Sequence, residues 1–261
     1  MLEALSLIAI VSYAAALTRL CFGAQKSTES SRRLILGFSA LGGLAHITAS
    51  LISMFSGDTA DFSLIQSGSL IFSITILLLS ASCLRRPLHA LFLGLEPIAI
   101  VLILASLITP PTKTAQYDVG TSIHIVFSIL AYGVVLIAAC CAVMLYYGNY
   151  LLRHKHIGAA LSRLPPLETM DRLLFEIILC CQVLLTLSIL SGFIFLDDIF
   201  AQHLIHKTFF SLLSWCIYGA LLVGHYRFGW RGTQAILWTL AGFVALVFAY
   251  VGSKLVLEWI L

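Results

Sequence analysis

Residues 204–232 decide the class of fold, and they read LIHKTFFSLLSWCIYGALLVGHYRFGWRG. The segment carries a histidine near each end, His206 and His225, and the sequence between them is mostly apolar. As an α-helix, this interval would measure roughly 28 Å, close to the hydrocarbon thickness of a bilayer. The stretch therefore predicts a transmembrane helix with one imidazole near each membrane face.

The composition of the whole chain supports a membrane protein. Of 261 residues, 60% are hydrophobic and 10% are charged, against about 25% charged residues in soluble domains. Mean hydropathy is +1.02. The net charge of +3 is small, and the basic residues lie in short loops, so the sequence lacks the basic patch of a nucleic-acid-binding protein. We expect an all-α polytopic membrane protein.

Eight apolar runs are long enough to cross a bilayer. They cover roughly residues 4–23, 34–55, 64–84, 88–108, 121–148, 173–196, 205–225 and 234–257. Pro166, followed by Glu168, predicts the start of the sixth helix. No internal repeat, low-complexity segment or soluble domain interrupts the pattern. The sequence predicts a bundle of eight transmembrane helices that forms a single integral membrane domain over residues 1–261.

The loops between the runs alternate in charge, and this alternation predicts an orientation. Three basic residues, Lys113, Lys207 and Lys254, fall on one side of the predicted bundle. The other twelve of the fifteen fall on the opposite side, and they are Arg19, Lys26, Arg32, Arg33, Arg85, Arg86, Arg153, Lys155, Arg163, Arg172, Arg227 and Arg231. By the positive-inside rule, the side with twelve basic residues is cytoplasmic. Both termini are therefore expected on the extracytoplasmic side.

Three of the eight histidines are candidate functional residues. His46 lies about twelve residues into the second run, where an ionisable side chain is costly and is either functional or bonded as a neutral imidazole to a neighbouring helix. His124 and His206 open the fifth and seventh runs at matching depth, and His46 is expected about 5–10 Å deeper. All three therefore fall in the outer half of the membrane. We interpret the remaining candidates near the cytoplasmic side, His89, His154 and His156, as surface residues.

Neutral imidazoles of this kind can bind haem iron, zinc, copper or nickel. Haem needs only two axial imidazoles on facing helices and apolar or aromatic walls, which 16 Phe, 9 Tyr and 4 Trp residues can supply. None of the seven cysteines belongs to a CxxC motif that would favour zinc. Three interpretations stay open: a haem-binding protein, a metal-ion transport-associated or regulatory membrane subunit using the same histidines, and a scaffold whose histidines stabilise helix contacts.

Five stretches of the chain resemble the cytochrome c assembly protein family, the polytopic haem-handling proteins of c-type cytochrome maturation. They are HIVFSILAYG (124–133), LPPLE (164–168), HKTFFSLLSW (206–215), GWRG (229–232) and AYVGSKLV (249–256). The likeness covers nearly the whole chain and is strongest over residues 124–258. Within the family, the chain is most similar to the small HemX-like branch of bacterial inner-membrane proteins.

The resemblance implies roles for six residues. The matched positions are His124, Tyr132, Lys207, Trp215, His225 and Arg227. His124 matches a histidine that opens a helix ahead of the haem-handling loop of the synthases in this family. That loop is rich in tryptophan in the synthases, whereas the corresponding segment here, GFIFLDDIFAQHLIHK (192–207), contains none. The resemblance therefore implies the fold and haem contact, and it does not extend to synthase activity.

We predict a haem-binding or haem-handling protein of cytochrome c biogenesis in a bacterial inner (plasma) membrane, not itself an enzyme. The expected cofactor is haem b, with His124 as one iron ligand and either His46 or His206 as the other. Lys207 is expected to attract the haem propionates. Secondary candidates for haem contact are Tyr132, Trp215, His225 and Arg227. Expected partners are haem, the lipid bilayer and other cytochrome maturation or membrane transport proteins.

Overall fold

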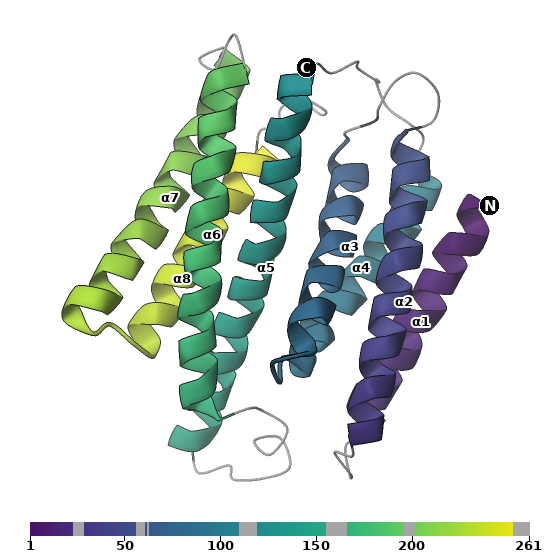
Figure 1. Cartoon of the computed structure of the whole chain (residues 1–261), viewed down its shortest axis with the longest axis horizontal. Helices are drawn as coiled ribbons and strands as arrows, with labels where there is room; N and C mark the ends of the chain where they lie inside the picture. Colours follow the sequence, from purple (N-terminus) through teal and green to yellow (C-terminus); the bar gives the residue numbers. More distant parts are fainter. Residues whose placement is uncertain are drawn as a thin grey trace. The chain divides into compact units, whose positions relative to one another are not determined.

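The structure is a computed structural model, and it describes residues 1–22, 29–55, 61, 63–109, 119–154, 166–195 and 202–252. The helices are α1 (Leu2–Phe22), α2 (Glu29–Met54), α3 (Leu64–Cys83), α4 (Phe92–Ile108), α5 (Val119–Arg153), α6 (Leu167–Phe195), α7 (Gln202–Phe228) and α8 (Thr233–Val247) (Figure 1). A 3₁₀ turn, η1 (His89–Leu91), precedes α4, and a short π-helical segment, η3 (Phe248–Gly252), continues α8.

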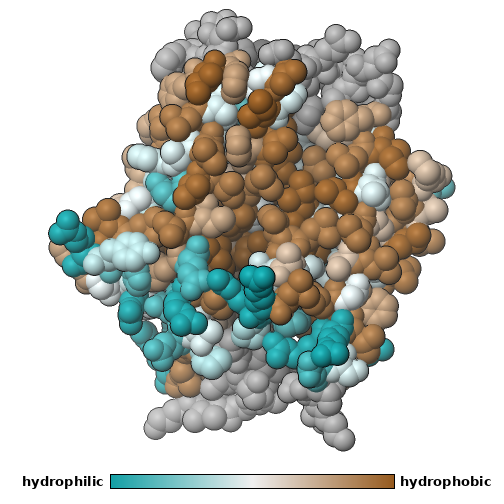
Figure 2. Space-filling view, viewed as in Figure 1, coloured by the Kyte–Doolittle hydropathy of each residue, from teal (hydrophilic) through white to brown (hydrophobic). Residues whose placement is uncertain are grey.

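The predicted class of fold is confirmed. Within the described residues, eight helices are long and apolar enough to cross a membrane, and no strand occurs there. On the face shown in Figure 2, apolar side chains cover the middle of the helices and hydrophilic ones gather near helix ends. Many large apolar side chains are exposed on the helices, among them Val101, Val126 and Val183. Such side chains suit a surface that faces lipid.

The helix ends differ from the predicted runs where polar residues continue the helix. Helix α2 begins at Glu29, five residues before the predicted run, and its first turns are held by an ion pair between Glu29 and Arg33. Helix α5 ends at Arg153 and not at residue 148. Helix α6 begins at Leu167, directly after Pro166, as the proline and Glu168 predicted. The predicted end of the eighth run, residues 253–257, lies outside the described residues.

The chain divides into two compact units, Met1–Gln116 and Tyr117–Leu261. In the first unit, α1 packs against α2 and α4, and α3 packs against the same two helices, so the four form a closed ring. In the second unit, α5 packs against α6 and α8, and α7 packs against the same two. Each unit is thus a small four-helix bundle. The predicted single integral membrane domain stays a prediction.

Glycines allow large aromatic rings to lie against helix backbones in both units. A Cβ atom at Gly42 of α2 would lie 2.6 Å from Cε1 of Tyr13, and one at Gly242 of α8 would lie 2.7 Å from Cζ of Tyr218. Both tyrosines are fully buried. Small residues of this kind bring transmembrane helices close together. Tyr13 therefore depends on a glycine of α2 for its place in the core of the first unit.

Candidate functional site

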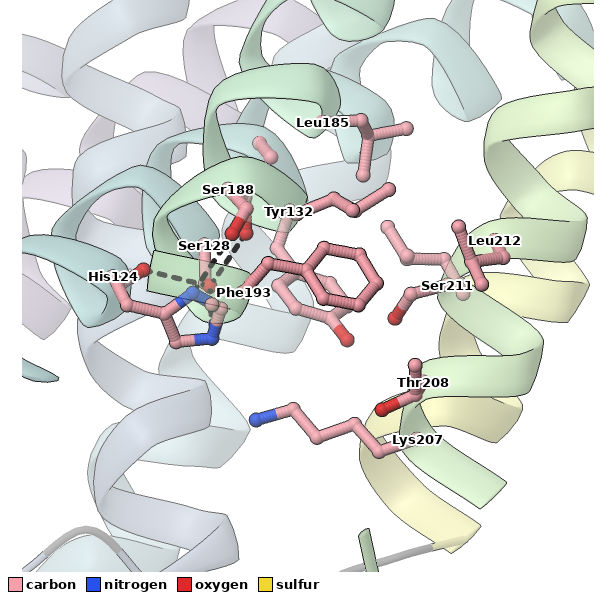
Figure 3. A pocket seen from close by; sticks show the side chains of 14 residues that line it. His124, Ser128, Tyr132, Leu185, Ser188, Phe193, Lys207, Thr208, Ser211 and Leu212 are labelled. Atoms are coloured by element: carbon pink, nitrogen blue, oxygen red, sulfur yellow. Dashed lines mark hydrogen bonds between the residues drawn. The ribbon is translucent and has the colours of Figure 1, made fainter. Parts of the chain in front are cut away.

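A partly open pocket of ≈ 80 Å³ lies between α5, α6 and α7 of the second unit (Figure 3). Helix α5 contributes His124, Ser128, Ala131 and Tyr132; α6 contributes Leu185, Ser188, Ile189, Gly192 and Phe193; α7 contributes Lys207, Thr208, Ser211 and Leu212; and α8 contributes Leu246. Most of these side chains are apolar or small. The pocket therefore brings one imidazole and one ammonium group into an otherwise apolar setting.

The backbone of α6 orients the His124 ring. Nδ1 of His124 lies 2.8 Å from the carbonyl oxygen of Ser188 and 3.2 Å from Oγ of Ser191. Because a carbonyl oxygen only accepts hydrogen bonds, Nδ1 carries the proton and donates it, which leaves the lone pair on Nε2. Histidines that bind metals commonly donate their second ring N–H to a carbonyl in this way. His124 thus has the tautomer of an iron ligand.

The contact around Nε2 of His124 is weak. Ser128 Oγ lies 3.4 Å from that nitrogen, while the same hydroxyl donates a 2.8 Å hydrogen bond to the carbonyl oxygen of His124. Ser128 Oγ is also 2.8 Å from Ser188 Oγ. The hydroxyl is therefore already engaged in shorter hydrogen bonds. Nε2 remains the ring nitrogen best placed to bind a ligand.

Serines at helical spacing explain the local arrangement. Ser128 follows His124 by one turn on α5, and Ser188 and Ser191 share a face of α6 because three residues separate them. Small side chains at these positions let α5 and α6 approach, so the Ser188 carbonyl oxygen comes within reach of the imidazole. These three serines are site residues that sequence reasoning missed. The i,i+4 pair of His124 and Ser128 was the signal that could have found one of them.

Lys207 supplies positive charge to the pocket. Its half-buried side chain extends from α7 toward the His124 imidazole (Figure 3), and the two groups interact electrostatically. An ammonium group in an apolar pocket attracts carboxylate or phosphate groups of a ligand. The pair of Lys207 and His124 therefore suits a ligand that combines a metal centre with acidic groups.

Aromatic rings line the remaining walls of the pocket. Tyr132 and Phe193 both face it, from α5 and α6 (Figure 3). The Tyr132 ring lies 5.4 Å, centroid to centroid, from the ring of Tyr250 in the π-helical segment η3. Segments of π-helix are rare and often occur near functional sites. Aromatic and aliphatic walls of this kind fit the flat, apolar faces of a porphyrin.

The donor set fits haem, and the size of the pocket limits how haem can fit. Sites for drug-sized ligands usually measure roughly 300–1,000 Å³, whereas this pocket measures ≈ 80 Å³. A whole porphyrin therefore does not fit inside it and would have to extend through the open side. Nε2 of His124 could still contact the iron, because the iron has to reach only one edge of the pocket.

His206 lies beside the pocket but does not line it. Its side chain is exposed, and Lys207, the next residue, points inward. Successive residues on an α-helix point about 100° apart, so one of two neighbours faces the pocket. The pairing of His206 with His124 stays a prediction.

His46 lies in the first unit, and both of its ring nitrogens have hydrogen-bond partners. Nδ1 is 3.3 Å from the Tyr13 hydroxyl, and Nε2 is 2.8 Å from Ser69 Oγ. The side chain is 1% exposed. Iron binding by His46 would therefore require one of these hydrogen bonds to break, whereas His124 needs no such change.

His225 lies in a separate pocket of ≈ 300 Å³ lined by residues of α6, α7 and the following turn. Its ring stacks on Phe175 with centroids 3.5 Å apart, and its Nδ1–H donates to the Trp230 carbonyl oxygen at 2.9 Å. The other lining residues include the charged side chains Glu168, Asp171, Arg172, Glu176 and Arg231. This second pocket is much more polar than the first.

The remaining predicted residues are distributed outside the His124 pocket, apart from Tyr132. Trp215 is exposed on α7, and its Nε1–H donates to Thr186 Oγ1 at 2.9 Å. Arg227 is exposed near the end of α7, and His154 is exposed at the end of α5. His156 lies outside the described residues. The structure therefore brings together His124, Tyr132 and Lys207 from the predicted set.

Comparison with known proteins gives a family match and several relatives. The sequence profile described as "Cytochrome C assembly protein" matches residues 34–261. The chain is 28% identical over 259 residues to the inner membrane protein YpjD of Escherichia coli (strain K12), covering 98% of each chain. It is 30% identical over 90 residues to the cytochrome c biogenesis protein CcsA of Prochlorococcus marinus (strain MIT 9303), covering 34% of this chain and 28% of that one. No solved structure gives a significant match.

Proposed function

Because this chain belongs to the cytochrome c assembly protein family, we propose that it binds haem in the pocket between α5, α6 and α7 as an accessory of cytochrome c biogenesis. The observation that carries this proposal is the tautomer of His124, whose Nδ1–H donates to the Ser188 carbonyl oxygen at 2.8 Å. That hydrogen bond leaves Nε2 with its lone pair beside the pocket. An imidazole held in this way is ready to bind iron.

Lys207 and the apolar walls complete the proposed haem contact. The ammonium group would face the propionates, and Tyr132 and Phe193 would contact the porphyrin edge. The proposed cofactor is haem b, since the site needs only non-covalent contact. Of the two predicted partners of His124, His206 belongs to the same unit and is exposed beside the pocket, so it would be the second histidine to contact the iron. Bound haem would bring redox-active iron and, in reduced form, a visible α-band.

We assign the chain an accessory role and not a synthase role. The segment over residues 192–207 contains no tryptophan, whereas the synthases of the family present haem with a tryptophan-rich loop there. The partial likeness to CcsA covers 90 residues only. By its likeness to YpjD over nearly the full chain, we place it in the bacterial inner membrane, where the cytochrome maturation proteins are its expected partners.

A bare metal ion is the weaker alternative for the same histidines. Within the described residues, no group of three or more His, Cys, Asp or Glu side chains lies close enough to hold a metal ion. Transition metals in proteins usually take three or four protein ligands, whereas haem iron needs one or two. The site geometry therefore favours haem over a free ion.

Absorption spectra of the purified protein, oxidised in air and then reduced with dithionite, test the proposal. We expect a Soret band and a sharp reduced α-band in the wild type, and loss of both in His124→Ala. The matched control is His154→Ala, directly after the far end of α5, where the imidazole is exposed and distant along the chain from the pocket. The control should keep the wild-type spectrum.

Two outcomes would contradict the proposal. A folded His124→Ala protein that keeps the wild-type Soret band would place the haem elsewhere, with His225 as the next candidate. A colourless wild-type protein that binds a stoichiometric metal ion would favour the metal-transport alternative. Gel filtration of each variant in the same detergent shows whether it is folded.

A further inference from the structure

A line of buried polar side chains runs through the first unit, separate from the His124 pocket. Its central members are joined by hydrogen bonds. Ser50 Oγ of α2 lies 3.1 Å from Ser69 Oγ of α3, which in turn lies 2.8 Å from Nε2 of His46. Nδ1 of His46 lies 3.3 Å from the hydroxyl of Tyr13 on α1. Three helices therefore contribute to one connected chain of hydroxyl and imidazole groups.

Glu96 lies at one end of this line and is 0% exposed. Ser39 Oγ donates to its Oε1 at 2.6 Å, while Oε2 is buried without a hydrogen-bond partner among the described residues. Helix α4, which carries Glu96, packs against α1, which carries Tyr13. A buried carboxylate with a single donor is costly inside a membrane, because its charge is neither hydrated nor paired. The neutral acid, with its proton on Oε2, costs far less.

The other end of the line reaches the start of α3. Gln66 precedes Ser69 by three residues and shares one face of α3 with it, and Ser63 is the residue directly before the helix. Gln66 Oε1 and Ser63 Oγ are also buried without partners among the described residues. Just before the helix, the buried Asp61 accepts a hydrogen bond from the Ser63 backbone N–H at 2.9 Å. Buried oxygens of this kind usually bind water or an ion.

The line covers a large part of the membrane thickness. Ser39 and Ser50 are eleven residues apart on α2, which corresponds to about 16 Å of helix, and Gln66 and Asp61 extend it further. Tyr13 and His46 are the titratable groups that α1 and α2 place on it. Arg32 and His89 interact with each other elsewhere in the unit. No basic side chain in the described part of the unit is found to pair with Glu96.

We propose that this line is a proton path through the first unit, with Glu96 as its proton-holding site. Glu96 keeps a proton on Oε2, and Tyr13, His46, Ser69 and bridging water connect it to Asp61. In an exchange, one proton enters at Asp61 and moves group by group to Glu96, and the proton that Glu96 held returns along the same groups to Asp61, so every group ends with the number of protons it began with. The path does not depend on haem, and it would exist in a protein that bound none.

Infrared spectroscopy of the reconstituted full chain at neutral pH tests the proposal. A protonated carboxyl group gives a carbonyl stretching band that a carboxylate lacks. We expect this band in the wild type and its loss in Glu96→Gln. The matched control is Glu176→Gln, at a carboxylate on the surface of α6, which should keep the band. Ser39→Ala should move the band to higher frequency, because Oε1 loses its hydrogen bond.

Exchange into D₂O tests the path itself. Deuteration shifts the band of the acid, and we expect the shift to be slower in Tyr13→Phe and in Gln66→Leu than in the wild type. If Glu96→Gln fails to fold, the frequency shift in Ser39→Ala still assigns the band. Absence of a band assignable to Glu96 would overturn the proton-holding site, and unchanged exchange in both path variants would overturn the path.

Discussion

At the scale of single residues, Lys207 distinguishes a ligand site from a structural contact. Its side chain shares an apolar pocket with His124, and a negative charge there would repel the propionates of haem. We predict that Lys207→Glu lowers the amount of haem per protein by more than it lowers protein abundance. The ratio of Soret absorbance to protein, measured beside an immunoblot of membranes, checks this.

Lys207→Arg is the matched control, because it keeps the positive charge and should keep most of the haem. An equal fall of haem and protein in Lys207→Glu would contradict the role in ligand binding. It would indicate that the lysine contributes to folding alone.

The second histidine predicted to contact the proposed haem is also tested at this scale. His46 has both ring nitrogens in hydrogen bonds, and His206 is exposed beside the pocket. We predict that alanine at whichever of these two histidines contacts the iron gives a high-spin spectrum or removes haem, because the iron would lose one of two imidazoles. Spectra of His46→Ala and His206→Ala identify it. Wild-type spectra in both variants would rule out both residues.

Candidate site residues could be picked out from the sequence where the side chain is unusual for its surroundings. His46, His124 and Lys207 stand out because ionisable groups are rare in apolar runs. The partner of His124 was not predictable, since a backbone carbonyl such as that of Ser188 exists at every position. Glu96 does not stand out in the sequence, because its burial depends on how α4 is rotated toward α1.

At the scale of elements, α2 contains two glycines that test how helices pack. A Cβ atom at Gly42 would lie 2.6 Å from the Tyr13 ring, whereas one at Gly37 would meet nothing within 4 Å. We predict that Gly42→Ala destabilises the protein by about 1–3 kcal/mol, since Tyr13 must move within a packed core. Gly37→Ala should be neutral or stabilise by up to about 1 kcal/mol.

Thermal unfolding of both variants in one detergent measures the difference. Both variants replace a glycine of α2 with alanine, so effects on membrane insertion and on helix propensity should be equal in the two. Equal midpoints would mean that the contact between Gly42 and Tyr13 does not hold α1 against α2.

Helices were predicted more reliably than their ends. Hydropathy reports which residues can face lipid, so it missed the polar first turns of α2 and the last turn of α5, which are helical but not apolar. It also carried no information on the rotation of each helix about its axis. That rotation decides that Lys207, and not His206, enters the pocket.

At the scale of the whole molecule, the orientation in the membrane follows from charge. Twelve of the fifteen basic residues fall in loops on one predicted side, and translocating them would be costly. We predict that a reporter active only in the cytoplasm is silent when fused after Leu261 and active when inserted after Arg86. A strong signal from the Leu261 fusion would indicate an odd number of spans or the opposite orientation.

Eight spans were predictable from the sequence, but their grouping into two rings of four was not. Which helices pack together depends on small residues such as Gly42 and Gly242 meeting particular rings, and single-sequence patterns do not identify partners. The family match begins at residue 34. Helix α1, which supplies Tyr13, lies outside that match.

The length of α5 also gives a measure of depth. Tyr146, Tyr147 and Tyr150 are exposed near its end, and tyrosines on the lipid-facing surface gather where hydrocarbon meets the lipid headgroups. His124 precedes Tyr146 by 22 residues, or roughly 33 Å of helix, about one hydrocarbon thickness. With the tyrosines at one interface, His124 lies at the other. The proposed ligand of His124 would then be exchanged within the headgroup layer, where the lipid composition of the membrane would directly affect its binding.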